Sequence, residues 1–115
     1  MKLLLALALL VLTFSSKAGS GNELYEQYLI YQGAIKGERT SIEDVSKGAH
    51  YMGYVYGVAS TLSADGKICI PENVTTAQLA DVVGKFLDDS PAIRNKESIV
   101  LTYAALLSSF RCEEE

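Results

Sequence analysis

The chain has 115 residues, with 10 basic and 14 acidic side chains and a formal net charge of −4. This length accommodates one domain and not two. An acidic domain is a poor match for nucleic-acid backbones, because proteins bind those through lysine and arginine. The negative net charge is compatible with a basic protein partner, or it serves only to keep the protein soluble.

The start of the chain has the pattern of a secretory signal peptide. Lys2 precedes an apolar run over residues 3–14, and small residues around Ala18 fit a cleavage site. The run is shorter than the roughly 20 residues that a membrane anchor needs. A buried N-terminal helix is the alternative interpretation. We expect residues 1–18 to be cleaved on export, leaving a single helical domain over residues 19–115 with a net charge of −6.

Turn signals divide the mature sequence into helical segments, so the expected fold is all-α. The first helix is expected over Asn22–Lys36, with Asn22 as its cap and Gly37 as its stop. The second is expected from Ser41, which opens the capping-box pattern SIED, to about Leu62.

The third helix is expected to follow Thr75, because TTAQ places Gln78 three residues after a capping threonine. It ends at DDSP. The fourth is expected over about Glu97–Phe110. Its predicted buried side chains are Ile99, Val100, Tyr103, Leu106, Leu107 and Phe110. The expected architecture is therefore a small bundle of about four helices.

Three glycines interrupt the second helix, and each weakens a helix by about 1 kcal/mol relative to alanine. Gly53 and Gly57 are four residues apart and share a face. Tight packing against another helix of the same chain is one interpretation of this face. A homodimer seam is the other.

The two cysteines predict one disulfide. Cys69 lies in the segment ICIP, which is expected to be extended because Pro71 disfavours a helical residue before it. Cys112 lies just beyond the fourth helix. An even number of cysteines in an exported chain is read first as a disulfide. Closing this loop should contribute roughly 3–4 kcal/mol.

No catalytic, cofactor or metal constellation is evident in the sequence. His50 is the single histidine, and no cysteine and histidine spacing fits zinc. Asp88 and Asp89 are adjacent and not a spaced pair of carboxylates. We expect a chain that is not an enzyme. Two further classes stay open: a small acid-stress-type periplasmic chaperone, and a secreted helical ligand-binding protein whose cavity is lined by tyrosines and aliphatic side chains.

Four segments together resemble the Tai-type immunity proteins of type VI secretion. They are GYVYGV (53–58), CIPENVTTAQL (69–79), VVGKFLDDSP (82–91) and AALLSSFRC (104–112). The resemblance implies a periplasmic protein, usually homodimeric, that blocks a cysteine-histidine peptidoglycan amidase injected by other cells. It implies no cofactor and no catalysis.

The sequence departs from the family pattern at two places. Relatives often carry a second cysteine pair, and the corresponding positions here are Tyr28 and Tyr51. Both cysteines are missing together, as expected if one bridge was lost as a unit. Arg111 stands where proline is common before the last cysteine.

The amidases that the resemblance implies are papain-like, and an inhibitor of such an enzyme needs a protrusion that reaches into its cleft. The first expected effector-binding segment is the exposed turn containing Ser63, Asp65 and Lys67. A carboxylate at Asp65 could meet a charged catalytic histidine. The second is the acidic pair Asp88 and Asp89. Both segments could equally be ordinary polar turns.

Overall fold

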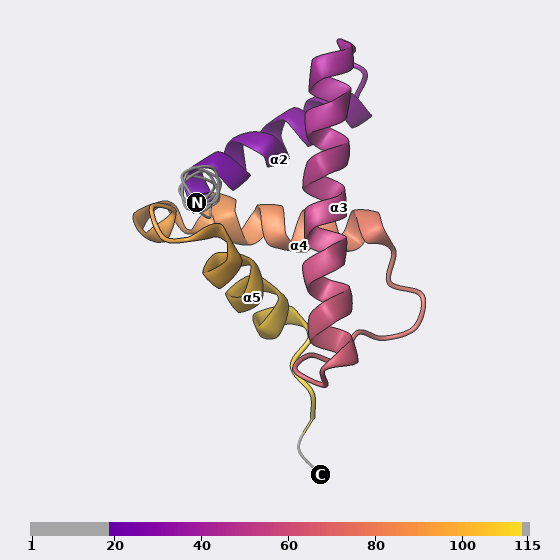
Figure 1. Cartoon of the computed structure of the whole chain (residues 1–115), viewed down its shortest axis with the longest axis vertical. Coiled ribbons are helices and arrows are strands. Elements are labelled where there is room, and N and C mark those ends of the chain that lie inside the picture. The colour runs from indigo at the N-terminus through magenta and orange to yellow at the C-terminus, as the bar shows by residue number, and fades with distance from the viewer. Residues whose placement is uncertain (1–18, 114–115) are drawn as a thin grey trace, which may run out of the picture.

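The computed structural model describes residues 19–113, and they form an all-α domain, as expected. The helices are α2 (Gly21–Ile35), α3 (Ile42–Ala64), α4 (Thr76–Asp89) and α5 (Ser98–Ser109), with a short 3-10 turn η1 (Pro91–Ile93) before α5. The long helix α3 is crossed by α4 near its middle, α2 joins its upper part, and α5 lies beside its lower part (Figure 1). The expected signal peptide, residues 1–18, lies outside the described residues.

None of the helices described in residues 19–113 combines the length and the apolar character that crossing a membrane requires.

The start of α2 differs from the prediction. Ser20, and not Asn22, is the cap, and its hydroxyl accepts a hydrogen bond from the Glu23 N–H at 3.3 Å. The start of α2 is set by residues that are distant in the sequence. The Ser98 N–H donates to the Gly19 carbonyl and the Gly21 N–H donates to the Lys96 carbonyl, both at 2.8 Å. These bonds pair the start of α2 with the start of α5.

The other predicted helix starts are confirmed. Ser41 caps α3 by accepting from the Asp44 N–H, and Thr75 caps α4 in a reciprocal capping box with Gln78. Gly37 has a φ of 74°, which suits glycine after a helix end. Helix α3 continues to Ala64, two residues beyond the predicted end.

Tyrosines from two helices form the centre of the core. Tyr51 is 0% exposed, and its ring centroid lies 5.6 Å from that of Tyr28 and 5.5 Å from that of Tyr31. The Tyr51 hydroxyl donates to the Ala80 carbonyl at 2.6 Å, which ties α3 to α4. A Cβ at Gly84 would lie 2.1 Å from the Tyr28 ring, so α4 needs glycine there. Tyr28 and Tyr51, the positions at which the resemblance implies a missing cysteine pair, pack against each other between α2 and α3.

The glycines of α3 do not share one role. A Cβ on Gly48 would lie 3.3 Å from the Tyr31 Cα, so α2 and α3 approach closely there. A Cβ on Gly53 or Gly57 would meet nothing within 4 Å. The interpretation of these two as a site of tight packing within the chain is therefore wrong, because they lie on the exposed side of α3.

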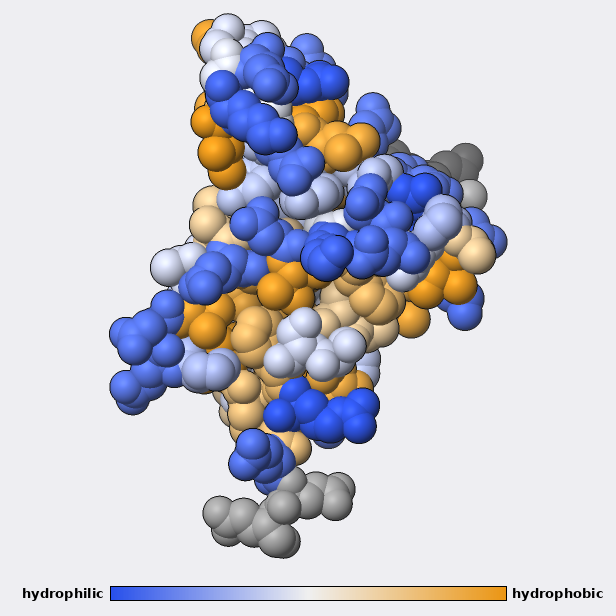
Figure 2. All heavy atoms as spheres, turned by 180° about the vertical axis from the view of Figure 1, so that it is seen from behind, coloured by the Kyte–Doolittle hydropathy of each residue, from blue (hydrophilic) through white to orange (hydrophobic). Residues whose placement is uncertain are grey.

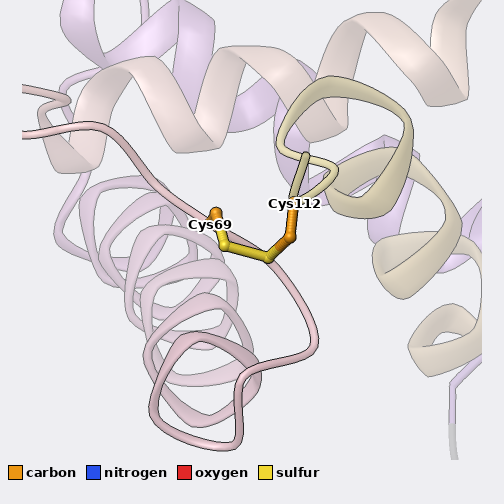
Figure 3. The surroundings of a disulfide bond; sticks show 2 residues. All are labelled: Cys69 and Cys112. Atoms are coloured by element: carbon orange, nitrogen blue, oxygen red, sulfur yellow. A yellow bond between two sulfur atoms is a disulfide. The ribbon is translucent and has the colours of Figure 1, made fainter. Parts of the chain in front are cut away.

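The predicted disulfide between Cys69 and Cys112 is confirmed, with their Cα atoms 4.9 Å apart. It joins the extended link after α3 to the segment that follows α5 (Figure 3). The Cys69 N–H also donates to the Phe110 carbonyl at 2.8 Å, and the neighbouring Ile68 is 1% exposed. The link is thus held by one covalent bond, one backbone hydrogen bond and one buried side chain.

Candidate partner-binding surface

The fourth helix exposes part of the face that the sequence was expected to bury. Ile99, Val100 and Tyr103 are 43%, 52% and 37% exposed. The buried side of α5 is instead formed by Ser98, Leu101, Thr102, Ala105 and Leu106. The helix is apolar on most of its circumference, so periodicity could not identify the buried side. Thr102 is tolerated in the core because its hydroxyl donates to the Ser98 carbonyl at 2.8 Å.

The exposed apolar side of α5 faces the lower half of α3 across a groove of about 430 Å³. We call it the α3–α5 groove. Its lining residues are Val58, Leu62, Asp65, Lys67, Ile99, Val100 and Tyr103. Five of the seven are apolar or aromatic, and the two charged residues come from the turn after α3. An apolar concavity with few polar groups is typical of a binding site.

The turn at the end of α3 is fixed by backbone hydrogen bonds. Asp65 follows the last residue of the helix, and Gly66 has a φ of 71° that favours glycine. The Lys67 N–H donates to the Leu62 carbonyl at 2.9 Å, and the Gly66 N–H to the Ser63 carbonyl at 3.1 Å. Asp65 and Lys67 are therefore held in place beside the apolar groove.

The predicted effector-binding residues fall in two separate places. Ser63 is exposed in the last turn of α3, next to the groove residues Asp65 and Lys67. Asp88 and Asp89 lie at the end of α4. In Figure 1, this end of α4 and the link that leads into α4 lie on opposite sides of α3. The end of α4 is also distant from the lower end of α3. The structure does not bring the two segments together.

Asp88 and Asp89 already have partners within the chain. Asp88 accepts a hydrogen bond from the Tyr25 hydroxyl at 2.5 Å, and Asp89 forms an ion pair with Lys85 at 3.2 Å. The Arg94 guanidinium lies 4.2 Å from the centre of the Tyr25 ring. The hydrogen bond to Asp88 raises the pKa of Tyr25 above its ordinary value. The contacts of Tyr25 connect α2 with the end of α4 and with Arg94, the residue that follows η1, which is a structural role.

His50 is exposed on α3. Within residues 19–113, no three histidine, cysteine, aspartate or glutamate side chains are grouped so that they could hold a metal ion. The arrangement that the structure does offer is a surface for contact with another molecule.

Apolar side chains reach the surface in several places besides the groove. On the face opposite to the view of Figure 1, a band of hydrophilic side chains crosses the molecule and apolar side chains gather below it (Figure 2). At the junction of α2 and α3, Ile35 and Ile42 are 63% and 89% exposed. Neither position was predicted from the sequence to lie on the surface.

The chain is similar over most of its length to one known family. A family model described as Rap1a immunity proteins matches residues 20–112. No curated protein and no solved structure matches the chain. The expected resemblance to immunity proteins is confirmed at this level, and it includes α2, which lies before the quoted motifs. The chain therefore belongs to the Rap1a immunity proteins, a family of proteins that are not enzymes.

Proposed function

We propose that this chain is a periplasmic immunity protein that binds a cysteine-histidine peptidoglycan amidase delivered by type VI secretion and occludes its active site. Membership of an immunity family implies protection against a cognate effector protein. This membership is the observation that carries the proposal. The amidase and the type VI route come from the motifs at residues 53–58, 69–79, 82–91 and 104–112.

The proposed location follows from the sulfur chemistry and from the start of the chain. A disulfide persists in oxidising compartments such as the bacterial periplasm and is rare in the cytosol. The signal-peptide pattern of residues 1–18 provides a route of export. A peptidoglycan amidase acts on the wall in that same compartment.

The proposed effector contact is the α3–α5 groove together with the turn beside it. Binding would bury the apolar surface of the groove, and burial of apolar surface dominates the energetics of most protein interfaces. The turn supplies Ser63, Asp65 and Lys67, which can contact polar groups at the mouth of the amidase's active-site cleft. Asp88 and Asp89 are the weaker candidates, because their carboxylates are already paired within the chain.

The two other function classes receive less support. A ligand-binding protein was expected to line a cavity with tyrosines and aliphatic side chains, but Tyr28, Tyr31 and Tyr51 pack against one another in the core. A chaperone would use exposed apolar surface, and the groove is such a surface. The family match favours an immunity protein over a chaperone.

We also propose that the chain acts as a homodimer.

The function is tested by producing the chain in the periplasm together with a cysteine-histidine amidase encoded beside it. We expect the chain to prevent lysis and to form a complex that can be isolated. Val100→Asp places a charge in the groove and should weaken binding at least tenfold. Ser108→Asp, at an exposed position of α5 outside the groove lining, is the matched control and should protect fully.

Asp65→Asn tests the turn without changing its size. We expect it to reduce affinity most at low salt, since a charge at an interface rim is screened by ions. Unchanged lysis in the presence of the folded wild-type chain would contradict the proposed function. Protection that survives Val100→Asp would contradict only the assignment of the groove.

A further inference from the structure

Gly19 is held against the start of α5. Its carbonyl accepts a hydrogen bond from the Ser98 N–H at 2.8 Å, and the next residue, Ser20, forms an isolated antiparallel bridge with Glu97. Ala18, after which the signal peptide is expected to be cleaved, immediately precedes Gly19 in the sequence. The contacts that hold α2 to α5 therefore begin with the first residue of the expected mature chain.

The Glu23 carboxylate lies beside Gly19 and not where a capping box would place it. Ser20 and Glu23 have the spacing of a capping box, in which the acidic side chain accepts from the N–H of the cap. Gln78 does this for Thr75 at the start of α4. At the start of α2, only the hydroxyl of the cap takes part. A Cβ on Gly19 would lie 2.8 Å from Glu23 Oε2, so the carboxylate occupies the space next to the glycine Cα.

A small polar cavity of about 140 Å³ lies beside Gly19. The Ser98 hydroxyl, on a residue that is 8% exposed, lies 3.9 Å from the Cβ position of Gly19 and 3.4 Å from the Tyr54 hydroxyl. Of the lining residues, all in the described part of the chain, Glu23 is the only carboxylate and none is a lysine or an arginine. Acceptor oxygens with one negative charge suit a small cation with N–H donors. The polar lining residues are Ser20, Glu23, Gln27, His50, Tyr54 and Ser98.

We infer that the signal peptide is cleaved between Ala18 and Gly19 and that the new amino terminus binds the Glu23 carboxylate at this cavity. The cleavage is a hydrolysis. The oxygen of the water becomes part of the Ala18 carboxylate, and the Gly19 nitrogen becomes an ammonium with three N–H donors. The mature chain thereby supplies the cation that the cavity suits.

The geometry brings the two charges within reach of each other. The nitrogen and the Cβ position of a residue are both bonded to its Cα and lie about 2.5 Å apart. The Gly19 nitrogen is therefore at most about 5.3 Å from Glu23 Oε2. Glu23 is exposed, so rotation of its side chain can close the remaining distance. Glycine at position 19 leaves space for the carboxylate beside the main chain.

Cleavage at a neighbouring bond would not give this contact. A cut one residue earlier would leave Ala18 in front of Gly19 and move the positive charge by about 3.5 Å along an extended chain. A cut one residue later would remove the carbonyl that accepts from the Ser98 N–H. The small residues before the cleavage site and the contacts after it thus indicate the same bond.

The helix dipoles oppose the new charge, and Glu23 offsets them. Both α2 and α5 begin at this place, and the N-terminal end of a helix carries a partial positive charge that disfavours a cation. The effect of the new amino terminus should therefore depend on this one carboxylate. The precursor has an uncharged peptide N–H at Gly19 and lacks the ion pair. The domain reaches its full stability only after export and processing.

Two versions of the mature chain test the inference, each made as a ubiquitin fusion that is cut before a chosen first residue. One begins at Gly19 and the other at Ala18. We expect the Gly19 chain to melt about 3 °C higher at low salt, since an exposed ion pair contributes little and a domain of this size shifts by several degrees per kcal/mol. Glu23→Gln should remove or reverse this difference. Glu26→Gln, at another exposed carboxylate of α2, is the matched control and should leave the difference unchanged.

The first residue of the chain recovered from the periplasm provides a second test. Mass spectrometry should identify it as Gly19. A different first residue or an uncleaved chain would overturn the inference, as would equal melting of the two versions or a difference that survives Glu23→Gln. The inference rests on the proposed export and not on the identity of the effector. A chain that begins at Gly19 and melts as expected but does not prevent lysis would contradict only the proposed function.

Discussion

The two ends of the domain are stabilised in different ways. Where α2 and α4 meet α3, the rings of Tyr28, Tyr31 and Tyr51 pack with centroids 5.5–6.5 Å apart, and a tyrosine hydroxyl bonds to the backbone of α4. At the lower end, the link between α3 and α4 is joined to the end of α5 by the Cys69–Cys112 bond. Packing within the first region acts in the folded state. A cross-link acts largely by restricting the unfolded chain.

A disulfide at one end of a small domain can hold a binding surface rigid where packing is sparse. The proposed effector contact lies at the lower end, where an extended link replaces a helix. An extended segment buries few side chains, so the bond and the buried Ile68 supply what packing does not. At the upper end, aromatic packing connects α2 with α3.

Tyr51→Ala should have the largest effect on stability. Tyr51 is 0% exposed and contacts two other rings, so its loss leaves a cavity at the junction of three helices. Truncation of large aromatic side chains in a core costs about 3–5 kcal/mol. Urea unfolding followed by circular dichroism measures the change. Tyr103→Ala, at an exposed position, is the control and should cost less than about 1 kcal/mol. Equal costs for the two variants would refute the packed core.

Replacing both cysteines by serine should have the next largest effect. The bond closes a loop with a sequence separation of 43, for which the chain-entropy estimate is about 4 kcal/mol, and measured values are commonly 2–4. We expect a loss of about 3 kcal/mol and, for the unfolded unreduced wild type, no reactive thiol. Unchanged unfolding after replacement would show that the lower end does not depend on the bond.

The fold was largely predictable because its signals are local. Ser41 and Thr75 begin their helices where the capping patterns placed them, and the link at Cys69 is extended before Pro71 as expected. The start of α2 was not predictable in the same way. It is set by hydrogen bonds to residues 94–98, more than 70 positions later in the chain.

The candidate site was harder to predict from the sequence. The turn with Asp65 and Lys67 was identified from its composition, and its place beside a groove depends on α5. Periodicity assigned Ile99 and Val100 to the core, because a helix that is apolar on most sides gives no preferred face. Only the packing of Leu101 and Ala105 against the other helices determines that these side chains point outward.

The tyrosine region should also make the domain sensitive to alkaline pH. Burial raises the pKa of Tyr51 well above 10.0, and burial raises those of Tyr28 and Tyr31 as well. Below pH 10 each phenol is protonated in both states. Above pH 10 the unfolded chain releases the Tyr51 proton and the folded chain keeps it, so stability falls as the pH rises, by up to about 1.4 kcal/mol per pH unit for Tyr51, and Tyr28 and Tyr31 add to the loss in the same direction. Urea unfolding from pH 8 to 11 measures the slope, and Tyr51→Phe should make it shallower. An identical slope would contradict the assignment to Tyr51.

Thr75→Ala should have the smallest effect of the four, and it probes the boundary between the two ends. The Thr75 hydroxyl accepts from the Gln78 N–H at 3.1 Å, and the Gln78 side chain accepts from the Thr75 N–H at 2.7 Å. Loss of a helix cap costs about 1 kcal/mol. Thr76→Ala, one residue into the helix, retains both bonds and serves as control. If α4 is positioned mainly by burial of Leu79 and Val83, the cost of Thr75→Ala in urea unfolding stays near this value. A cost close to that of removing the disulfide would instead mean that the link determines where α4 begins, and the division between a packed end and a cross-linked end would fail.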